Sequence, residues 1–246
     1  MDLNVIIPAG GSGSRFGGQP KQYRMLGDHP VLVQTASAFA RWNRACHVWI
    51  VVPHGDQAYV AGMFADYPGD IDYVVGGRTR QESVLNALRE VSGGSCPPGD
   101  EGVVFVHDAV RPFVDGALLD RVMRAAERSG AAAPAVAVFD TLRTVDGAWF
   151  GRTVGRDGLY RMQTPQAFRF GRILAAHEWA ASEGINATDD VELYIRFGGH
   201  VEKVEGAEEN LKITTVGDLY LARDVWERLI AGPSARPIGA DAARPK

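Results

Sequence analysis

The chain has 246 residues, of which 46% are hydrophobic and 23% are charged. That profile is typical of a globular protein with a sizeable core. Lysine and arginine number 26 and aspartate and glutamate 30, which gives a formal net charge of −4. An overall basic field that would attract nucleic acid is therefore absent. A small anionic substrate is still possible, because a few local cations are enough to bind it.

Cysteine usage and apolar runs point to the cytoplasm. Cys46 and Cys96 lie far apart and form no zinc-type spacing, so neither a disulfide framework nor structural zinc is expected. The first residues enter a strand-like run with no basic leader segment. The longest apolar stretch, residues 131–139, is short and contains Pro134, which argues against a membrane span. A cytoplasmic enzyme is the expectation.

Short apolar runs alternate with segments of helical spacing along most of the chain. Strands are predicted at residues 3–7, 48–52, 71–75, 103–107, 132–138 and 201–204. Helices are predicted at residues 30–42, 57–67, 80–91, 118–128, 170–184, 189–197 and 218–229. This alternation predicts an α/β fold with a mostly parallel central sheet and helices on both faces.

The alternation changes after Val138. Residues 140–153 form two short alternating runs around Asp146-Gly147, a dipeptide that favours a tight hairpin turn. We predict a projecting β-hairpin within an arm at residues 139–165. Residues 1–231 are predicted to be a single domain. The tail at 232–246 is rich in proline, glycine and alanine and is predicted to be disordered.

A glycine-rich segment, PAGGSGSRFGGQPK, runs from Pro8 to Lys21 directly after the first predicted strand. Glycines let backbone N–H groups wrap around a phosphate. Arg15 adds a planar fork for oxyanions, and Lys21 adds a point charge. The segment lacks the endings of a Walker loop and of a dinucleotide fingerprint. It predicts a phosphate-binding loop, and the alternative is a glycine-rich turn that carries surface charges.

Asp108, in the motif HDAVRP, falls just past the carboxyl end of a predicted central strand. Ligands of open α/β sheets bind at that edge. A carboxylate there is well placed to hold Mg²⁺, although an aspartate at a strand end also commonly caps the next helix. His107 is expected to pack or to form hydrogen bonds, and we assign it no catalytic role.

Two further segments carry weaker signals. GGRTRQES, at residues 76–83, follows a strand and opens a helix. Such a turn can read a base or ribose through backbone groups and the Ser83 hydroxyl, or it can be simply a capped helix start. Lys212 lies in an extended segment after the last predicted strand, where a lone lysine is usually a solvated charge.

In their order and spacing these four segments resemble the cytidylyltransferases of the methylerythritol phosphate route to isoprenoids. The resemblance runs from about residue 3 to residue 229. Further pieces that carry it are PKQY at 20–23, DT at 140–141, TVGR at 153–156, QTPQ at 163–166, TDD at 188–190 and ENLKIT at 209–214.

The family makes 4-diphosphocytidyl-2-C-methyl-D-erythritol from CTP and 2-C-methyl-D-erythritol 4-phosphate, a small sugar-alcohol phosphate, and releases pyrophosphate. The resemblance implies a Rossmann-like three-layer fold of the nucleotide-diphospho-sugar transferase type. It also implies Mg²⁺ or another divalent cation at Asp108, and a homodimer whose arms are exchanged between subunits. Neither nucleic acid nor a membrane is an expected partner.

The resemblance also implies roles for individual residues. The implied catalytic residues are Arg15, Lys21 and Lys212, of which the two lysines would flank the α-phosphate. The implied CTP-binding residues are Pro8, Ala9, Gly10, Gly11, Gly13, Arg15, Lys21, Gly76, Gly77, Arg80, Ser83 and Asp108. The implied sugar-phosphate residues are Asp108, Ala109, Arg111, Thr141, Arg156, Thr164, Thr188 and Lys212. Thr141 and Arg156 of the arm would then serve the neighbouring subunit.

Two alternative functions remain open on the sequence. A ribitol-5-phosphate cytidylyltransferase shares the HDxVRP and NLKITT motifs. However, Ala109 is typically serine there, and residues 153–160 fit the methylerythritol enzymes better. A non-catalytic nucleotide-binding module is the second alternative, and it would not need Lys21, Asp108, Lys212 and the arm together.

Overall fold

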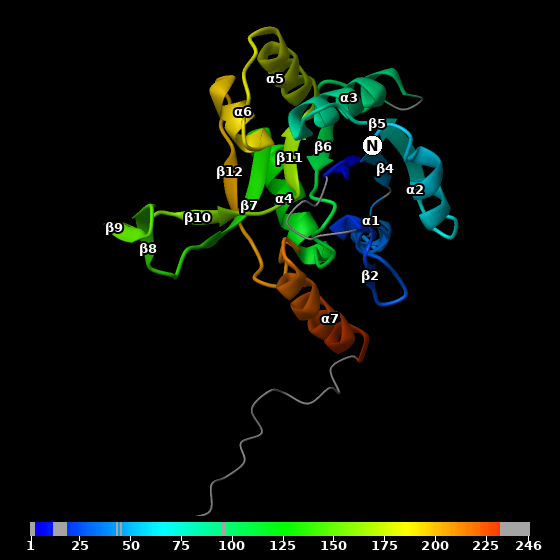
Figure 1. The fold of residues 1–246 in the computed structure, drawn as a ribbon. Helices are drawn as coiled ribbons and strands as arrows, with labels where there is room; N and C mark the ends of the chain where they lie inside the picture. The colour runs from blue at the N-terminus through cyan, green and yellow to red at the C-terminus, as the bar shows by residue number, and fades with distance from the viewer. Residues whose placement is uncertain (1–2, 12–18, 43, 45, 95–96, 232–246) are drawn as a thin grey trace, which may run out of the picture.

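The computed structural model describes residues 3–11, 19–42, 44, 46–94 and 97–231. An eight-stranded sheet lies at its centre (Figure 1). Its strands are β1 (Leu3–Pro8), β4 (Cys46–Val52), β5 (Asp70–Val75), β6 (Val103–Val106), β7 (Ala131–Ala137), β10 (Tyr160–Met162), β11 (Gln166–Arg169) and β12 (Glu202–Glu205). Their order is β10-β7-β11-β6-β1-β4-β5, and β12 pairs with β7.

The sheet is mostly parallel, as predicted. β1 pairs in parallel with β4 and β6, β4 with β5, and β12 with β7. β10 and β11 run antiparallel to their neighbours. These two strands were not predicted. They have only three and four residues, and segments of that length are specified by their partners in the sheet more than by their own pattern.

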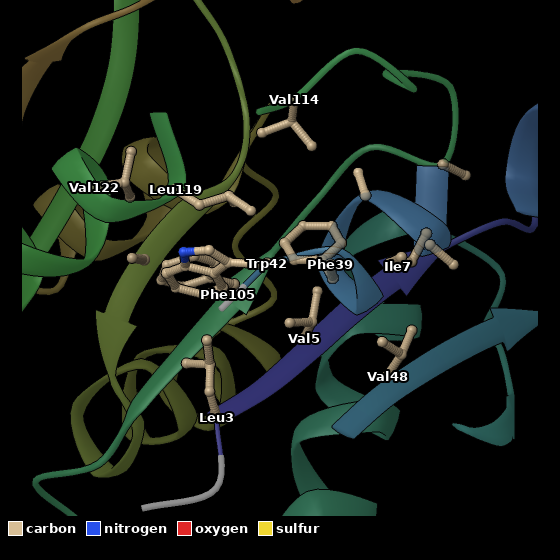
Figure 2. Packing of buried hydrophobic residues seen from close by; sticks show 14 of the residues in the cluster. Leu3, Val5, Ile7, Phe39, Trp42, Val48, Phe105, Val114, Leu119 and Val122 are labelled. Carbon is tan, nitrogen blue, oxygen red and sulfur yellow. The ribbon is translucent and has the colours of Figure 1, made fainter. Parts of the chain in front are cut away.

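Alternate residues of the central strands face opposite sides of the sheet, because the side-chain period of a strand is two. Val5 and Phe105 pack on one face, and Ile6 and Val104 pack on the other. Figure 2 shows the first of these clusters, in which the Trp42 ring stacks on Phe105 with centroids 5.7 Å apart. Because core packing occupies both faces of the sheet, a site can form only where the strands end.

The helices cover both faces, which confirms the predicted layering (Figure 1). They are α1 (Val31–Ala40), α2 (Gln57–Met63), α3 (Arg80–Gly93), α4 (Gly116–Ser129), α5 (Phe170–Ser182), α6 (Asp190–Arg196) and α7 (Val216–Ala231). The predicted helix at 57–67 is shorter than expected and ends at Met63. Polar caps set several starts: Thr79, Asp115 and Asp189 each accept a hydrogen bond from a backbone N–H in the first turn.

The predicted hairpin forms from β8 (Leu142–Asp146) and β9 (Trp149–Val154) and projects from the body of the molecule (Figure 1). Gly147 has a φ of 55° in its turn, as the Asp-Gly dipeptide favours. A second, smaller hairpin of β2 (Met25–Leu26) and β3 (His29–Pro30) was not predicted. It follows the 3-10 turn η1 (Lys21–Tyr23), and Leu26 packs against α7 through Leu219.

Among the described residues, no helix combines the length and the apolar character needed to span a bilayer. The tail at 232–246, predicted to be disordered, lies outside the described residues.

Candidate functional site

A cavity of about 420 Å³, here called the main cavity, opens at the sheet edge where the parallel strands β1 and β6 end. Its size falls in the ~300–1,000 Å³ range of small-molecule sites. It is lined by Pro8, Ala9, Gly10, Gly11, Lys21, Gln22, Gly77, Arg78, Thr79, Arg80, Ser83, Asp108, Ala109, Val110 and Lys212. The structure thus brings together all four segments that the sequence singled out.

The predicted nucleotide residues divide into three groups. Pro8, Ala9, Gly10, Gly11, Lys21, Gly77, Arg80, Ser83 and Asp108 line the main cavity. Gly76 lines an adjoining cavity that shares Gly10, Gly77 and Ser83 with the main one. Gly13 and Arg15 lie outside the described residues, so their roles stay predictions.

The loop after β1 is fixed by a residue that the sequence did not single out, Gln22. This buried amide donates hydrogen bonds to the Ala9 carbonyl at 2.7 Å and to the Gly11 carbonyl at 3.1 Å. Among the residues that the structure describes, none has an atom within 4 Å of a Cβ built on Gly10 or Gly11. The described part of the chain thus leaves room for a ligand beside these glycines. The only signal in the sequence was an amide beside Lys21 in the PKQY motif.

The turn before α3 is packed tightly by its own atoms. The Ser83 hydroxyl donates to the Thr79 carbonyl at 2.8 Å and accepts from the Gly77 N–H at 3.1 Å. A Cβ on Gly77 would lie 2.3 Å from Glu82 Cβ, so glycine is required there. Since a hydroxyl has one donor and two lone pairs, Ser83 keeps one acceptor position for a ligand. In the predicted contact with a base or ribose, the Ser83 hydroxyl can therefore only accept a hydrogen bond from the ligand.

Asp108 follows β6 and lies between two cations. Its Oδ2 is 3.0 Å from Arg111 Nε and 3.1 Å from Lys212 Nζ. Burial alone would raise the pKa of this carboxyl, but Lys212, Arg111 and Arg80 together lower it well below its usual value. The carboxylate is therefore charged at neutral pH and holds Lys212 at the edge of the cavity.

Each of the three guanidinium nitrogens of Arg111 donates a hydrogen bond to the protein. Besides its bond to Asp108, it donates to the Asn210 carbonyl at 2.7 Å and to the Met162 carbonyl at 3.3 Å. The buried Asn210 side chain donates in turn to the Thr164 carbonyl at 2.8 Å. These bonds join the chain after β6, β10 and the segment that carries Lys212. The guanidinium predicted to hold the sugar phosphate thus also assembles the site.

His107 is fully buried and belongs to a chain of hydrogen bonds. Its Nε2 lies 3.1 Å from the Arg111 carbonyl, so this nitrogen carries the proton and donates. Its Nδ1 therefore accepts from the Thr164 hydroxyl at 2.9 Å, and that hydroxyl accepts from the Asp108 N–H at 3.0 Å. Burial lowers the pKa of His107 to about 4. The imidazole is neutral with both nitrogens occupied, so it has no free nitrogen to serve as a general base.

A second cavity of about 130 Å³, the side cavity, adjoins the main cavity. It is lined by Arg80, Asp108, Arg111, Met162, Gln163, Thr164, Gln166, Thr188, Asp189 and Lys212. Of the residues predicted to hold the sugar phosphate, Asp108, Arg111, Thr164, Thr188 and Lys212 meet here. Ala109 lines the main cavity instead. Arg80, Asp108 and Lys212 line both cavities and form what is here called the shared wall.

The two predicted arm residues line neither of these cavities. Thr141 and Arg156 are exposed, and Arg156 donates a hydrogen bond to the Phe139 carbonyl within the arm. The described chain thus does not bring them to its own site.

Asp108 fits a Mg²⁺ site in which the protein supplies one carboxylate and the bound substrate supplies phosphate oxygens. Among the described residues, no group of three or more His, Cys, Asp or Glu is placed to hold a metal. Of the described residues that line the main cavity, Asp108 alone carries a carboxylate. Mg²⁺ is commonly bound by one or two carboxylates plus substrate phosphates. Asp108 could therefore hold Mg²⁺ together with phosphate oxygens.

A glycine loop, two lysines and a half-buried aspartate that line one cavity at the strand ends of an α/β sheet suit a protein of the nucleotidyltransferase type. Residues 3–228 match the family model described as 2-C-methyl-D-erythritol 4-phosphate cytidylyltransferase, and the chain belongs to that family. This confirms the resemblance found in the sequence.

Individual relatives agree. A protein of Salinibacter ruber named 2-C-methyl-D-erythritol 4-phosphate cytidylyltransferase is 42% identical over 98% of this chain and 100% of its own length. The bifunctional enzyme IspD/IspF of Rhodospirillum rubrum is 41% identical, and the match covers 96% of this chain and 59% of that protein. The solved structure of the cytidylyltransferase from Thermus thermophilus has a TM-score of 0.76 and 34% identity, covering 93% of this chain and 100% of that one.

The buried histidine predicts a pH dependence of stability. An unfolded histidine takes up its proton near pH ~6.5, whereas folded His107 does so at about 4. The stability contributed by neutral His107 is therefore fully present above pH ~6.5 and is lost as the pH falls toward 4. Between about pH 7 and about pH 5 we expect a loss of about 2 kcal/mol in unfolding free energy.

Chemical denaturation at the two pH values measures this loss. His107→Gln, whose amide can still donate to the Arg111 carbonyl, should show a clearly smaller loss. His200→Gln, at an exposed position, is the matched control and should behave like the wild type. Equal pH dependence in His107→Gln and the wild type would contradict the assignment.

Proposed function

We propose that the chain transfers CMP from CTP to 2-C-methyl-D-erythritol 4-phosphate and releases pyrophosphate, with 4-diphosphocytidyl-2-C-methyl-D-erythritol as the product. The single observation that carries this proposal in the structure is the shared wall of Arg80, Asp108 and Lys212. A nucleotide in the main cavity and a phosphate in the side cavity would meet there. Membership of the family supplies the identity of both substrates.

The chemistry follows from charge. An oxygen of the acceptor phosphate attacks the α-phosphorus of CTP, a new P–O bond forms, and the bond to the leaving pyrophosphate breaks. Because the acceptor phosphate is already an anion, no strong general base is needed. This agrees with a site in which both nitrogens of His107 are occupied. The main obstacle is the repulsion between two polyanions.

Cations at the cavity offset that repulsion. Lys21 and Lys212 line the main cavity, and in our proposal they flank the α-phosphate and stabilise the charge that develops on it. Arg15, which lies outside the described residues, is proposed as the third catalytic cation. Asp108 keeps Lys212 in place through its 3.1 Å ion pair. Fixed cations of this kind act without reorganisation during the reaction.

A divalent cation completes the proposal. Asp108 would hold Mg²⁺ together with the CTP phosphates. When bound, Mg²⁺ neutralises part of the charge on the phosphates and helps to orient them.

A reaction between two phosphorylated metabolites is expected in the cytoplasm, where such metabolites are made.

The direct test is pyrophosphate release with a panel of substrates. CTP with 2-C-methyl-D-erythritol 4-phosphate and Mg²⁺ should turn over, whereas ATP, GTP and UTP should be poor donors. Omitting Mg²⁺ should abolish turnover. D-ribitol 5-phosphate is the acceptor control, and activity with it alone would overturn the proposed acceptor. Equal use of all four nucleotides would contradict a base-reading role for residues 76–83.

We further propose that two copies of the chain form a dimer with exchanged arms. The arm exposes large apolar side chains: Phe139, Val145, Trp149, Phe150 and Tyr160 have exposed fractions from 42% to 81%. Several large apolar side chains exposed on one arm are typical of a protein interface. Thr141 and Arg156, predicted to bind the acceptor, lie on the same arm away from the chain's own cavities. An exchanged arm would carry them to the partner.

Mixing two inactive variants tests the exchange. Lys212→Ala disables the part of the site that the subunit's own cavities supply. Arg156→Ala disables the part that the arm supplies. If arms serve the neighbouring subunit, a mixed dimer contains one intact site and one doubly defective site. Random reassembly of equal amounts should then restore about a quarter of the wild-type activity. Each variant alone is the control. Failure of the mixture to exceed them, with mixed dimers demonstrated, would contradict the exchange.

A further inference from the structure

Arg80 of the shared wall forms an ion pair with a buried carboxylate, which also contacts a buried histidine. The three residues come from three different helices. Asp190, the first residue of α6, has its Oδ2 2.7 Å from Arg80 Nη2. Its Oδ1 is 3.1 Å from Nε2 of His177, which belongs to α5. The side chains of Asp190 and His177 are 2% and 0% exposed. Only Arg80, at the start of α3, is partly exposed, at 34%.

The helix itself does not need the Asp190 carboxylate. The cap of α6 is the preceding residue, Asp189, whose side chain accepts from the Glu192 N–H at 2.8 Å. Burial alone would raise the pKa of Asp190, but Arg80 and His177 lower it well below its usual value, so the group is charged. Replacing a buried ion pair by apolar residues is often neutral for stability. Stability alone is thus a poor explanation for this charge.

Arg80 connects the buried carboxylate to the site. It lines both the main and the side cavity. Although burial alone would lower the pKa of Arg80, the charges of Asp190 and Asp108 raise it. The guanidinium therefore pairs with the buried Asp190 carboxylate and also interacts electrostatically with the Asp108 carboxylate of the shared wall. Its position is set by the protein before any ligand arrives.

The neighbouring residue reinforces the same connection. Gln81 donates to the Ile185 carbonyl at 2.9 Å and accepts from the Ala187 N–H at 3.0 Å. The first turn of α3 is thus tied to residues 185–190 by two consecutive side chains. The same segment carries Thr188 and Asp189 of the side cavity. The nucleotide side and the acceptor side of the site are therefore joined directly.

We propose that Asp190 is a positioning residue, which holds the Arg80 guanidinium at the shared wall as a preorganised cation where the two phosphates meet. The inference rests on the proposed function. A cation fixed in the right place contributes mainly to the transition state, because it need not reorganise as charge moves. Loss of Asp190 therefore acts on kcat more than on the KM of either substrate.

Two possible effects of the Asp190 carboxylate, on the net charge of the site and on the position of Arg80, predict different results for Asp190→Asn. Asp190→Asn keeps the shape of the side chain and an oxygen that can accept from His177, but it removes the negative charge. If only net charge mattered, Arg80 would attract phosphates more strongly and KM would fall. If position matters, kcat falls by about 10- to 100-fold, the scale of a small misplacement of a catalytic group.

A double-mutant cycle separates positioning from a merely structural role. Single-turnover rates per folded, substrate-binding protein are measured for the wild type, Asp190→Asn, Arg80→Gln and the double variant. When Asp190 acts through Arg80, Asp190→Asn slows the wild type but adds little to Arg80→Gln. The matched control is Asp72→Asn. Asp72 also pairs with a histidine, His47 Nε2 at 2.9 Å, but lies outside both cavities and should leave the rate unchanged.

Each possible outcome supports or overturns the role of Asp190. Full activity of Asp190→Asn, or equal slowing in both backgrounds, overturns the positioning role. If Asp190→Asn does not fold, Asp190→Glu keeps the charge and shifts the carboxylate by one methylene. A lowered kcat with a near-normal thermal midpoint then supports the role, and an unchanged kcat overturns it. Absence of turnover in the wild type would instead contradict the proposed function.

Discussion

The ion pair between Asp108 and Lys212 is the interaction on which the rest of the site depends. The carboxylate stands at the end of a central strand, and the lysine comes from a segment about a hundred residues later in the chain. Arg111 completes the cluster through the same carboxylate oxygen. A charged carboxylate that is only 13% exposed is costly unless cations and donors compensate it. The same cations that compensate Asp108 are the ones that an anionic substrate requires.

This constraint explains why a network of buried hydrogen bonds surrounds Asp108. Arg111 donates hydrogen bonds to the carbonyls of Met162 and Asn210. The Thr164 hydroxyl donates to His107 and accepts from the backbone N–H of Asp108. Each bond ties a separate segment to the end of β6. A buried network of this kind rigidifies its surroundings. The cavities are therefore shaped before a substrate binds, as electrostatic catalysis requires.

Much of the fold and part of the site could be predicted from sequence, because both depend on local patterns. Apolar runs with period two and helical spacing indicated the parallel sheet and its helices, and the glycine loop and Asp108 marked the correct edge. The residues that were missed act at long range. Gln22 fixes the loop from outside it, and Asp190 reaches Arg80 from another helix. Neither residue belongs to a motif whose spacing shows its partner, so only the folded chain reveals the contact.

We propose that two anionic substrates meet at the wall formed by Arg80, Asp108 and Lys212. A crystal structure with the acceptor and a CTP analogue that cannot release pyrophosphate would show where each of them binds. We expect the triphosphate in the main cavity, the acceptor phosphate in the side cavity, and the α-phosphate beside Lys212 with Arg80 facing the acceptor. An α-phosphate bound away from this wall, or an acceptor outside the side cavity, would show that the two substrates do not meet there.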